Sequence, residues 1–451
     1  MKLKLSYYVI VSDSINSNND KVIFSTRTQS TLLISSTYWS YLEQSEFHLL
    51  PDDILSRLEK DKFLVPSNEE ELKNIIGENK GYIDKSKSRG TLYEVIQPTA
   101  MCQLGCDYCG QKHTKDYIST SLYDRLLERV EQKVKAGDYN RLLIGWFGAE
   151  PLVGLRQMRD LTMKLKEVAR KYGLQYSSKI VTNGLSLKEN IFEELVNDLA
   201  VNNIEITLDG TAEYHDVHRP TKGQKGTFEI IFNNLKKILN RKDFNDFKCD
   251  VSIRCNVDER NIEGVSPLIQ LLALHNMHNK ISHFYPIGVY SWGGNDAHKK
   301  SLTKEEFAQR EIDWFIEMLQ LGYNVNLLPG RVRQVCMAVS PVSDMYDAFG
   351  NVYNCTEVSY VSTYKDTRYI AGNLKNGLEN ISKDRELSNW NDDILTDKFP
   401  CHTCKMLPVC GGACPKSWHE DMRACPTSKF NIKEKLALHY AVLRGIEHVY
   451  V

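Results

Sequence analysis

Several features are absent from this sequence of 451 residues, and each absence narrows the class of protein. No apolar run is long enough to cross a membrane, so a membrane protein is not expected. The net charge of -1 includes no basic excess, which argues against nucleic acid as a partner. The short apolar run at the start lacks a small-residue cleavage site, which is not the pattern of a signal peptide. Internal repeats and low-complexity tracts are also lacking. We therefore expect a cytoplasmic, multidomain globular protein.

Cysteine, in contrast, is plentiful, with twelve residues in all. Cytosolic thiols stay reduced, so a patterned set of cysteines indicates metal binding rather than disulfides. Three lie at 102–109, two at 249 and 255, and seven between 336 and 425. The first and last groups predict two metal-binding regions, whereas Cys249 and Cys255 are interpreted as structural thiols.

Strand and helix patterns alternate through the middle of the chain. Strand-like runs lie at 92–99, 141–147, 178–184, 204–210, 249–257 and 281–288. Helical patterns lie between them; the first places Leu122, Leu126, Val130 and Val134 on one face. Six β-then-α units predict an α/β fold with a parallel sheet, closed or partly closed as a barrel. Chemistry in such barrels lies at the carboxyl ends of the strands.

The patterns divide the chain into five segments. Residues 1–88 predict a small α+β domain with three strands followed by helices, and the last helix runs into a polar linker. The barrel is expected over 92–310, and residues 303–325 have a helical pattern of their own. A bridging helix is expected over 311–335, a cysteine-rich domain over 336–426 and a C-terminal helix over 427–451.

The first cysteine group directly follows the first barrel strand. Cys102-x3-Cys106-x2-Cys109 places three soft ligands within eight residues. Three such thiolates can hold an iron–sulfur cubane and leave one iron free for a small molecule. A zinc site completed by His113, or a set of buried structural thiols, is the alternative interpretation.

With Tyr108 just before Cys109, this motif resembles the hallmark of radical S-adenosylmethionine (radical SAM) enzymes. The resemblance implies a partial (β/α)6, TIM-like barrel. It also implies that the free iron of a [4Fe–4S] cluster binds the methionyl amine and carboxylate of S-adenosylmethionine. In that family the cofactor is cleaved to a 5′-deoxyadenosyl radical, which abstracts a hydrogen from the substrate.

Further motifs occur at the expected strand ends. "FGAEP" resembles the family's Gly-Gly-Glu segment with alanine as its second small residue, and "TNG" and "TLDG" end the next two strands. "TLDG" is followed by "EYHDVHRP". Arg254 is a candidate partner for the cofactor carboxylate, because a guanidinium pairs with it bidentately. The cofactor contacts that the resemblance implies are Tyr108, Gly148, Ala149, Glu150, Asn183, Thr207 and Arg254.

The C-terminal cysteine pattern resembles the seven-cysteine SPASM domain of such enzymes. The resemblance implies two auxiliary [4Fe–4S] clusters, and hence three clusters in all. The outer one would be held by Cys401, Cys404, Cys410 and Cys425, and the inner one by Cys336, Cys355 and Cys414. Residues 327–335 contain no cysteine, so the inner fourth site is expected to be open or closed by another side chain, such as Cys255. A zinc ribbon on Cys401, Cys404, Cys410 and Cys414 is the alternative.

The resemblance leaves the substrate open between two classes of enzyme. Peptide maturases install thioether or carbon–carbon crosslinks in ribosomally made peptides. Residues 1–88 resemble, loosely, the winged-helix-like modules that bind leader sequences, where an extended peptide adds to a sheet edge. Anaerobic sulfatase-maturing enzymes instead oxidise Cys or Ser to formylglycine. Their base is an Asp directly after the second SPASM cysteine, where this chain has Thr356 and then Glu357, which is expected to point elsewhere.

The favoured hypothesis is therefore a cytoplasmic radical SAM peptide maturase, with the sulfatase-maturing type as the alternative. A non-catalytic electron-transfer protein is a further alternative, disfavoured because a carrier does not need the cofactor-side motifs. The expected partners are a precursor peptide with a leader sequence and an electron donor such as flavodoxin or ferredoxin. Weak candidates for an acid or base are Asp209, Glu357 and Tyr285.

Overall fold

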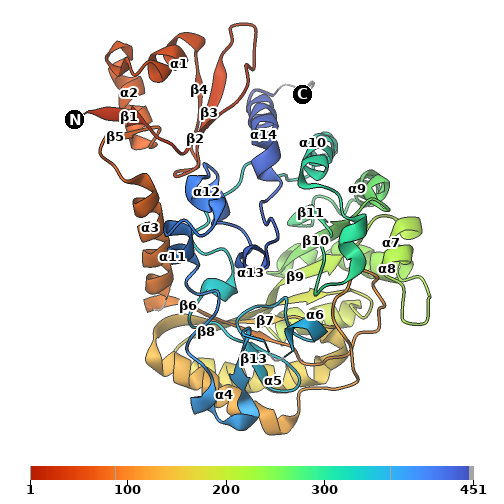
Figure 1. The fold of residues 1–451 in the computed structure, drawn as a ribbon. Coiled ribbons are helices and arrows are strands. Elements are labelled where there is room, and N and C mark those ends of the chain that lie inside the picture. The colour runs from red at the N-terminus through yellow and green to blue at the C-terminus, as the bar shows by residue number, and fades with distance from the viewer. Residues whose placement is uncertain (1, 87, 366, 446–451) are drawn as a thin grey trace.

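The N-terminal unit (residues 2–86) is a small α+β module. The structure is a computed structural model that describes residues 2–86, 88–365 and 367–445 (Figure 1). Strands β2 (Val9–Val11), β3 (Lys21–Ser25) and β4 (Thr31–Ile34) form an antiparallel sheet in that order, and β1 (Leu3–Leu5) pairs with β5 (Leu64–Pro66). The helices are α1 (Ser36–Glu43), α2 (Asp52–Lys60) and α3 (Glu71–Ser86). The predicted order of three strands followed by helices agrees with this arrangement.

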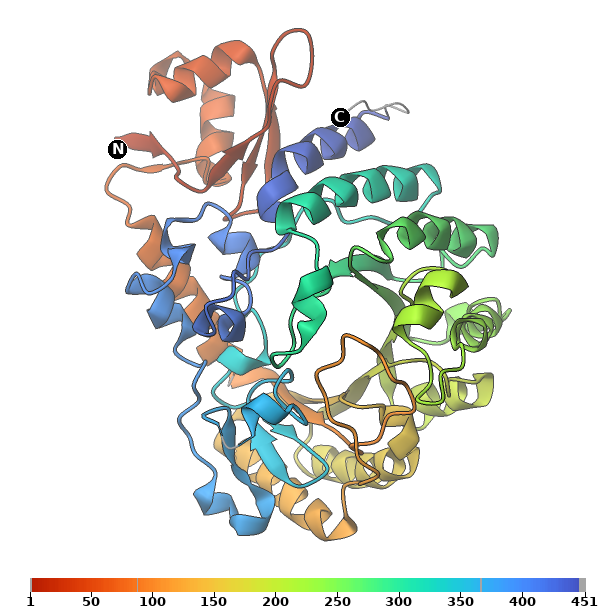
Figure 2. The ribbon, with the colours of Figure 1, turned by 45° about the vertical axis from the view of Figure 1, so that its right-hand side comes forward.

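Six parallel strands form the barrel. They are β6 (Ser88–Ile96), β7 (Asp138–Trp146), β8 (Gln175–Thr182), β9 (Val201–Thr207), β10 (Asp250–Val257) and β11 (His283–Gly288), and all six had been predicted. Neighbours pair in chain order, for example Arg254 beside Thr207 and Tyr285. In Figure 2 the strands curve around a central space and leave the barrel partly open. The prediction of a partial six-stranded barrel is confirmed.

Amphipathic helices cover the outside of the barrel. They are α4 (Thr120–Ala136), α5 (Leu155–Lys171), α6 (Glu189–Asn197), α7 (Ala212–His218), α8 (Phe228–Leu239), α9 (Val265–Leu274) and α10 (Lys304–Gln320). Their apolar faces pack on the strands in one large core, which includes the fully buried Leu126, Leu165, Phe192 and Ile253. Burial of this apolar area is the dominant stabilising term of such a layered fold. Helix α7 had not been predicted.

The cysteine-rich C-terminal segment extends the barrel sheet on the β6 side. Strands β12 (Met345–Tyr346), β13 (Asn351–Tyr353) and β14 (Ile370–Asn373) continue the nine-stranded sheet beyond β6, with β12 parallel to β6. Short helices then follow: α11 (Trp390–Leu395), α12 (Leu407–Cys410) and α13 (Pro415–His419). The longer α14 (Ser428–Leu443) comes last and packs against α10.

Two boundaries differ from the prediction. The bridging helix expected over 311–335 is wrong in its second half, because α10 ends at Gln320 and residues 321–335 are not helical. The polar linker expected after α3 is largely absent, because β6 already begins at Ser88. The C-terminal helix is present, but residues 446–451 of its expected range lie outside the described residues.

A buried ionic network joins the barrel to the C-terminal segment. Lys133 on α4 is shared by two carboxylates, with its Nζ 2.7 Å from Glu94 Oε1 on β6 and 2.6 Å from Asp344 Oδ2. Arg385 adds a second contact to Asp344, 2.6 Å from Nη2 to Oδ1. Removing one partner of such a buried network leaves an uncompensated charge, so the network fixes how the two parts sit together.

The N-terminal unit packs on the C-terminal cysteine loops, as Figures 1 and 2 both show. The Tyr7 hydroxyl donates to the Thr403 carbonyl at 2.7 Å, and Thr26 Oγ1 donates to the Lys405 carbonyl at 2.8 Å. Lys405 Nζ in turn donates to the Val9 carbonyl at 3.2 Å. Apolar packing accompanies these bonds, through Ile10, Val22, Phe24, Met406, Val409, Ile432 and Leu436. The edge of the sheet at β2 is therefore covered, whereas β4 forms its other edge.

Among the described residues, no helix is both long enough and apolar enough to span a membrane.

Candidate functional site

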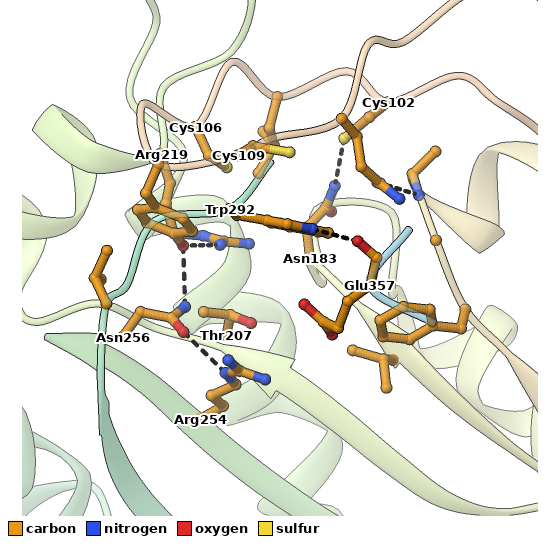
Figure 3. A pocket seen from close by; sticks show the side chains of 18 of the residues that line it. Cys102, Cys106, Cys109, Asn183, Thr207, Arg219, Arg254, Asn256, Trp292 and Glu357 are labelled. Carbon is orange, nitrogen blue, oxygen red and sulfur yellow. Dashed lines mark hydrogen bonds between the residues drawn. The ribbon is translucent and has the colours of Figure 1, made fainter. Parts of the chain in front are cut away.

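A cavity lies at the carboxyl ends of the barrel strands (Figure 3). Cys102, Cys106 and Cys109, on the loop between β6 and α4, line it together. The ends of the strands and the loops after them contribute the rest of the wall, with Gly148, Ala149, Asn183, Thr207, Arg254, Asn256, Tyr290 and Trp292 among the lining residues. The hollow measures about 1050 Å³ including its open mouth. That size suits a cofactor together with part of a substrate.

The environment of the three thiols matches a bound cationic centre. Burial raises the pKa of Cys102 to about 11 and that of Cys106 to about 12, and it also raises the pKa of Cys109. Burial penalises the thiolate, so these groups deprotonate together with the binding of a cationic centre. The donor set of three soft thiols on one cavity wall therefore fits the predicted iron–sulfur cluster.

The segment after β7 approaches the cavity through unusual backbone geometry. Gly148 has φ +79°, and a Cβ there would lie 1.9 Å from Nε2 of Gln97, so only glycine fits. Ala149 has φ +47°, the left-handed region that glycine prefers, and its N–H donates to Gln111 Oε1 at 3.0 Å. Ala149 stands where the Gly-Gly-Glu motif has its second glycine. Its backbone is therefore held in a strained conformation at the cavity wall.

Glu150 is not among the residues that line the cavity, and its predicted contact with the cofactor stays a prediction. The side chain is 1% exposed and accepts from Thr182 Oγ1 at 2.6 Å and from the Asn183 N–H at 2.7 Å. Glu150 therefore ties the end of β7 to the end of β8, near Cys102. Asn183 itself faces the cavity, and its Nδ2 donates to Cys102 Sγ at 3.8 Å.

A polar network centres on the Tyr108 hydroxyl, between two of the cysteines. This hydroxyl donates to Asp209 Oδ2 at 2.6 Å and accepts from Asn256 Nδ2 at 3.0 Å and from Arg219 Nη1. Asp209 also accepts from the Asn256 N–H at 2.7 Å. Asp209 is fully buried and lies outside the cavity wall, so it holds the cysteine loop against the strands rather than reaching the reacting atoms. Its candidacy as an acid or base is corrected accordingly.

Glu357 faces the cavity, contrary to the expectation that it would point elsewhere. Its Oε2 accepts from the Tyr290 hydroxyl at 2.9 Å, and its backbone carbonyl accepts from Trp292 Nε1 at 2.7 Å. Figure 3 shows this carboxylate on the wall opposite the three thiols, towards Arg254. Hydrogen bonds from Tyr290 and Trp292, which residue order does not reveal, hold Glu357 in this position.

Tyr285, the remaining acid or base candidate, does not line the cavity. Its hydroxyl bonds to Glu205 across the inside of the barrel, and burial raises its pKa well above 10. Arg254 does line the cavity and is half-buried; its Nε donates to Asn256 Oδ1 at 2.8 Å, and Nη1 lies 4.0 Å from Glu205 Oε1. The predicted contact of Arg254 with the cofactor carboxylate stays a prediction.

Four C-terminal thiols share a second, smaller pocket. It is lined by Cys401, Cys404, Cys410 and Cys425 together with Met406, Leu407, Trp418 and Lys429. Burial raises the pKa of Cys401 to about 12 and that of Cys410 to about 11, and Lys429 Nζ donates to Cys425 Sγ at 3.6 Å. Cys414 lies outside this wall. The four thiols that share the pocket are those of the predicted outer set rather than those of the zinc ribbon.

The three thiols of the predicted inner set lie near one another on the C-terminal side. Cys355 is buried, and burial followed by the charges of Glu357, Cys336 and Cys414 raises its pKa. Cys255 packs in the barrel core, away from the apolar cluster that contains Cys355, so it does not close the inner set. In the described ranges no three His, Cys, Asp or Glu side chains meet around a single-ion position.

Several lining residues escaped the sequence interpretation. Arg219 is the penultimate residue of the "EYHDVHRP" segment, and Asn256 lies two residues after Arg254 on the same strand. Both positions could therefore have been found from the sequence. Tyr290 and Trp292 lie in the loop after β11, where no pattern marks them. Their positions follow from the barrel, which brings the loops after all its strands to one face.

Comparison with known proteins finds a family model that matches part of the chain and relatives that are similar over most of it. Residues 96–248 match the family model of the Radical SAM superfamily. A cysteine-type anaerobic sulfatase-maturating enzyme from Clostridium novyi (strain NT) is 25% identical over 354 residues, 72% of this chain and 88% of the relative.

Two solved structures share the fold. Native anSMEcpe with bound AdoMet and Kp18Cys peptide has a TM-score of 0.55 at 17% identity, covering 78% of this chain and 98% of its own. Streptococcus suis SuiB bound to precursor peptide SuiA has a TM-score of 0.51 at 13% identity, covering 94% of this chain and 98% of its own.

Proposed function

We propose that this chain is a radical SAM peptide maturase, because residues 96–248 match the family model of the Radical SAM superfamily. It abstracts hydrogen from a ribosomally made peptide and installs a thioether or carbon–carbon crosslink. One observation carries the proposal: Cys102, Cys106 and Cys109 line the same cavity as the strand-end residues Gly148, Asn183 and Thr207. A site of this composition has three soft ligands and room for a further molecule beside them.

The residues present fit the cofactors that the family implies. The three thiols would hold a [4Fe–4S] cluster, and Tyr108, Gly148, Ala149, Asn183 and Thr207 would surround S-adenosylmethionine. When bound, these groups supply one-electron cleavage of the cofactor and hydrogen abstraction by the resulting 5′-deoxyadenosyl radical. The outer four-thiol pocket and the inner three-thiol set would hold two auxiliary [4Fe–4S] clusters, and a flavodoxin or ferredoxin would supply electrons.

Glu357 is the best placed proton acceptor in the cavity. Its carboxylate is oriented by the Tyr290 hydroxyl, and its backbone is fixed by Trp292. Removing a hydrogen atom from a thiol, hydroxyl or carbon centre and forming a new bond there also releases one proton and one electron. This carboxylate can take the proton, and an auxiliary cluster would accept the electron. Arg254, across the cavity, can orient a carbonyl or carboxylate of the peptide.

The N-terminal unit supports a peptide substrate with a leader sequence. Strand β4 forms an edge of its sheet, and the Ser25 N–H to Ser30 carbonyl bond sets the register with β3. By alternation along an antiparallel pair, Thr31 and Leu33 turn their N–H groups away from β3, where an extended peptide can add. The structural similarity to SuiB covers 94% of this chain, which is more than the barrel and the cysteine-rich segment together. The shared fold therefore includes part of the N-terminal unit.

One observation favours a second candidate, the oxidation of Cys or Ser to formylglycine. The carboxylate of Glu357 reaches the cavity although it is one residue later than the Asp of the sulfatase-maturing pattern. The similarity to the Clostridium novyi relative spans most of that protein. The N-terminal unit is the feature that favours the peptide maturase over this alternative.

Mass spectrometry distinguishes the two functions. Reduced, iron–sulfur-reconstituted protein is incubated with S-adenosylmethionine and, separately, with the products of short reading frames beside its gene and with a synthetic Cys-containing sulfatase peptide. A mass loss of two hydrogens in a gene-neighbour peptide supports the maturase. Conversion of Cys to formylglycine in the sulfatase peptide, with no change in the others, would establish the alternative.

A further inference from the structure

The polar residues of the "EYHDVHRP" segment divide into those that build the fold and one that faces the cavity. His215 Nδ1 accepts from the Asp209 N–H at 3.1 Å, and its Nε2 lies 3.1 Å from Thr227 Oγ1. Asp216 accepts from the Thr227 and Phe228 N–H groups at 2.7 and 2.8 Å, where α8 begins. Both side chains therefore close the turn between α7 and α8.

Arg219 is the member of this segment that lines the cavity. Its side chain is 8% exposed, donates from Nη1 to the Tyr108 hydroxyl, and lies 3.8 Å from Asp209 Oδ2. The Nε–H is buried and has no hydrogen-bond partner in the described part of the chain. A buried donor without a partner costs free energy, and an anion in the adjoining cavity would remove that cost.

The second guanidinium of the cavity is in a different electrostatic position. Arg254 donates through Nε to Asn256 Oδ1 and lies 4.0 Å from Glu205. The negative charge of Glu357 also reaches it. The Nε–H of Arg254 is therefore already hydrogen-bonded, and the carboxylates of Glu205 and Glu357 offset its charge. Among the described residues, Arg219 has one acidic neighbour within ion-pair distance, Asp209. That carboxylate is already bonded to Tyr108 and Asn256.

We propose that Arg219, rather than Arg254, binds the carboxylate of the methionyl group of S-adenosylmethionine. This inference rests on the proposed function. The free Nε edge of a guanidinium matches a planar carboxylate, and Arg219 lies beside Cys106 and Tyr108 on the cysteine-loop side of the cavity.

Equilibrium binding with two ligands isolates this contact. S-adenosylmethionine and decarboxylated S-adenosylmethionine are titrated into full-length, iron–sulfur-reconstituted wild type, Arg219→Met and Arg254→Met. In Arg219→Met the preference for the carboxylate-bearing ligand falls by about 10- to 100-fold, the range expected for one charge-assisted contact. Arg254→Met keeps the wild-type preference within about threefold. Direct binding of the ligand to iron contributes equally to the affinity of wild type and of both variants. A change in the preference between the two ligands therefore measures the contribution of the substituted arginine.

The outcomes separate this inference from the function on which it rests. If Arg219→Met keeps the preference, or Arg254→Met loses it, the assignment to Arg219 is wrong even though the protein binds the cofactor. If wild type binds neither ligand, the proposed function itself fails. Iron content and circular dichroism verify each variant. Should Arg219→Met not fold, Arg219→Gln retains an N–H for Tyr108 and takes its place with the same expectations.

Discussion

The two groups of thiols use the same ligand chemistry in opposite surroundings. Cys102, Cys106 and Cys109 face a large, open cavity whose other walls carry amides, hydroxyls and two guanidinium groups. The outer four thiols, Cys401, Cys404, Cys410 and Cys425, share a small pocket with largely apolar walls. Three thiols with polar space beside them leave room for a ligand, whereas four thiols in a tight pocket leave none. The number of donors and the space around them therefore assign different roles to the two groups.

The elements that support each group differ in the same way. Glu150 and Asp209 brace the first group by tying strand ends and the cysteine loop together inside the barrel. Within the part of the chain that the structure describes, the outer pocket is built from loops and short helices rather than from a sheet. Tyr7 and Thr26 of the N-terminal unit hold its loops by hydrogen bonds to backbone carbonyls. The first site is thus a feature of the barrel, and the second depends on contacts between distant parts of the chain.

Cys410→Ala should cause the largest structural change, because it removes one ligand from a pocket stabilised by its bound centre. We expect a loss of about four iron atoms per chain and a melting temperature lower by roughly 5–10 °C. Cleavage of S-adenosylmethionine at the first site should continue, because Cys410 lies in a separate pocket. Iron analysis and calorimetry measure both effects. Unchanged iron content would contradict the assignment of these four thiols to one centre.

Glu357→Gln should slow formation of the modified peptide by about 100-fold, the usual contribution of a positioned proton acceptor. The amide keeps the shape and the contact with Tyr290 but cannot accept the proton. Liquid chromatography of the product and of 5′-deoxyadenosine measures the two steps separately.

Glu305→Gln is the matched control, because that exposed carboxylate pairs with Arg423 far from the cavity and should leave the rate unchanged. A normal rate of product formation in Glu357→Gln would remove Glu357 from the mechanism.

The smallest effect is expected at the buried ionic network that joins the barrel to the C-terminal segment. Burial raises the pKa of Glu94 from 4.5 to about 7. The folded protein then binds this proton more tightly than the unfolded chain, so the stabilising contribution is complete below about pH 4.5 and is lost as the pH rises through 7. Glu94→Gln should flatten the fall of melting temperature between pH 5 and 7.5 by a few degrees. If the pH dependence of the melting temperature is unaltered in Glu94→Gln, protonation of Glu94 does not contribute to stability.

The order of elements and the cysteine motifs could be predicted from the sequence because they depend on local patterns. Apolar periodicity located all six barrel strands, and the resemblance to radical SAM enzymes is confirmed for residues 96–248. The orientation of single side chains could not be predicted. Glu150 is tied to the end of β8 and Glu357 lines the cavity, because tertiary hydrogen bonds decide where these side chains point. Helix α7 is only seven residues long, too short for a clear period.

The measurement that tests the account most directly is the formation of 5′-deoxyadenosine by reduced, reconstituted Cys102→Ala in the presence of S-adenosylmethionine. The comparison of the two thiol groups predicts that wild type and Cys410→Ala form it, whereas Cys102→Ala forms none above background, because only the first group borders the ligand cavity. Formation at the wild-type rate by Cys102→Ala would contradict the central claim that these three thiols hold the radical-generating centre.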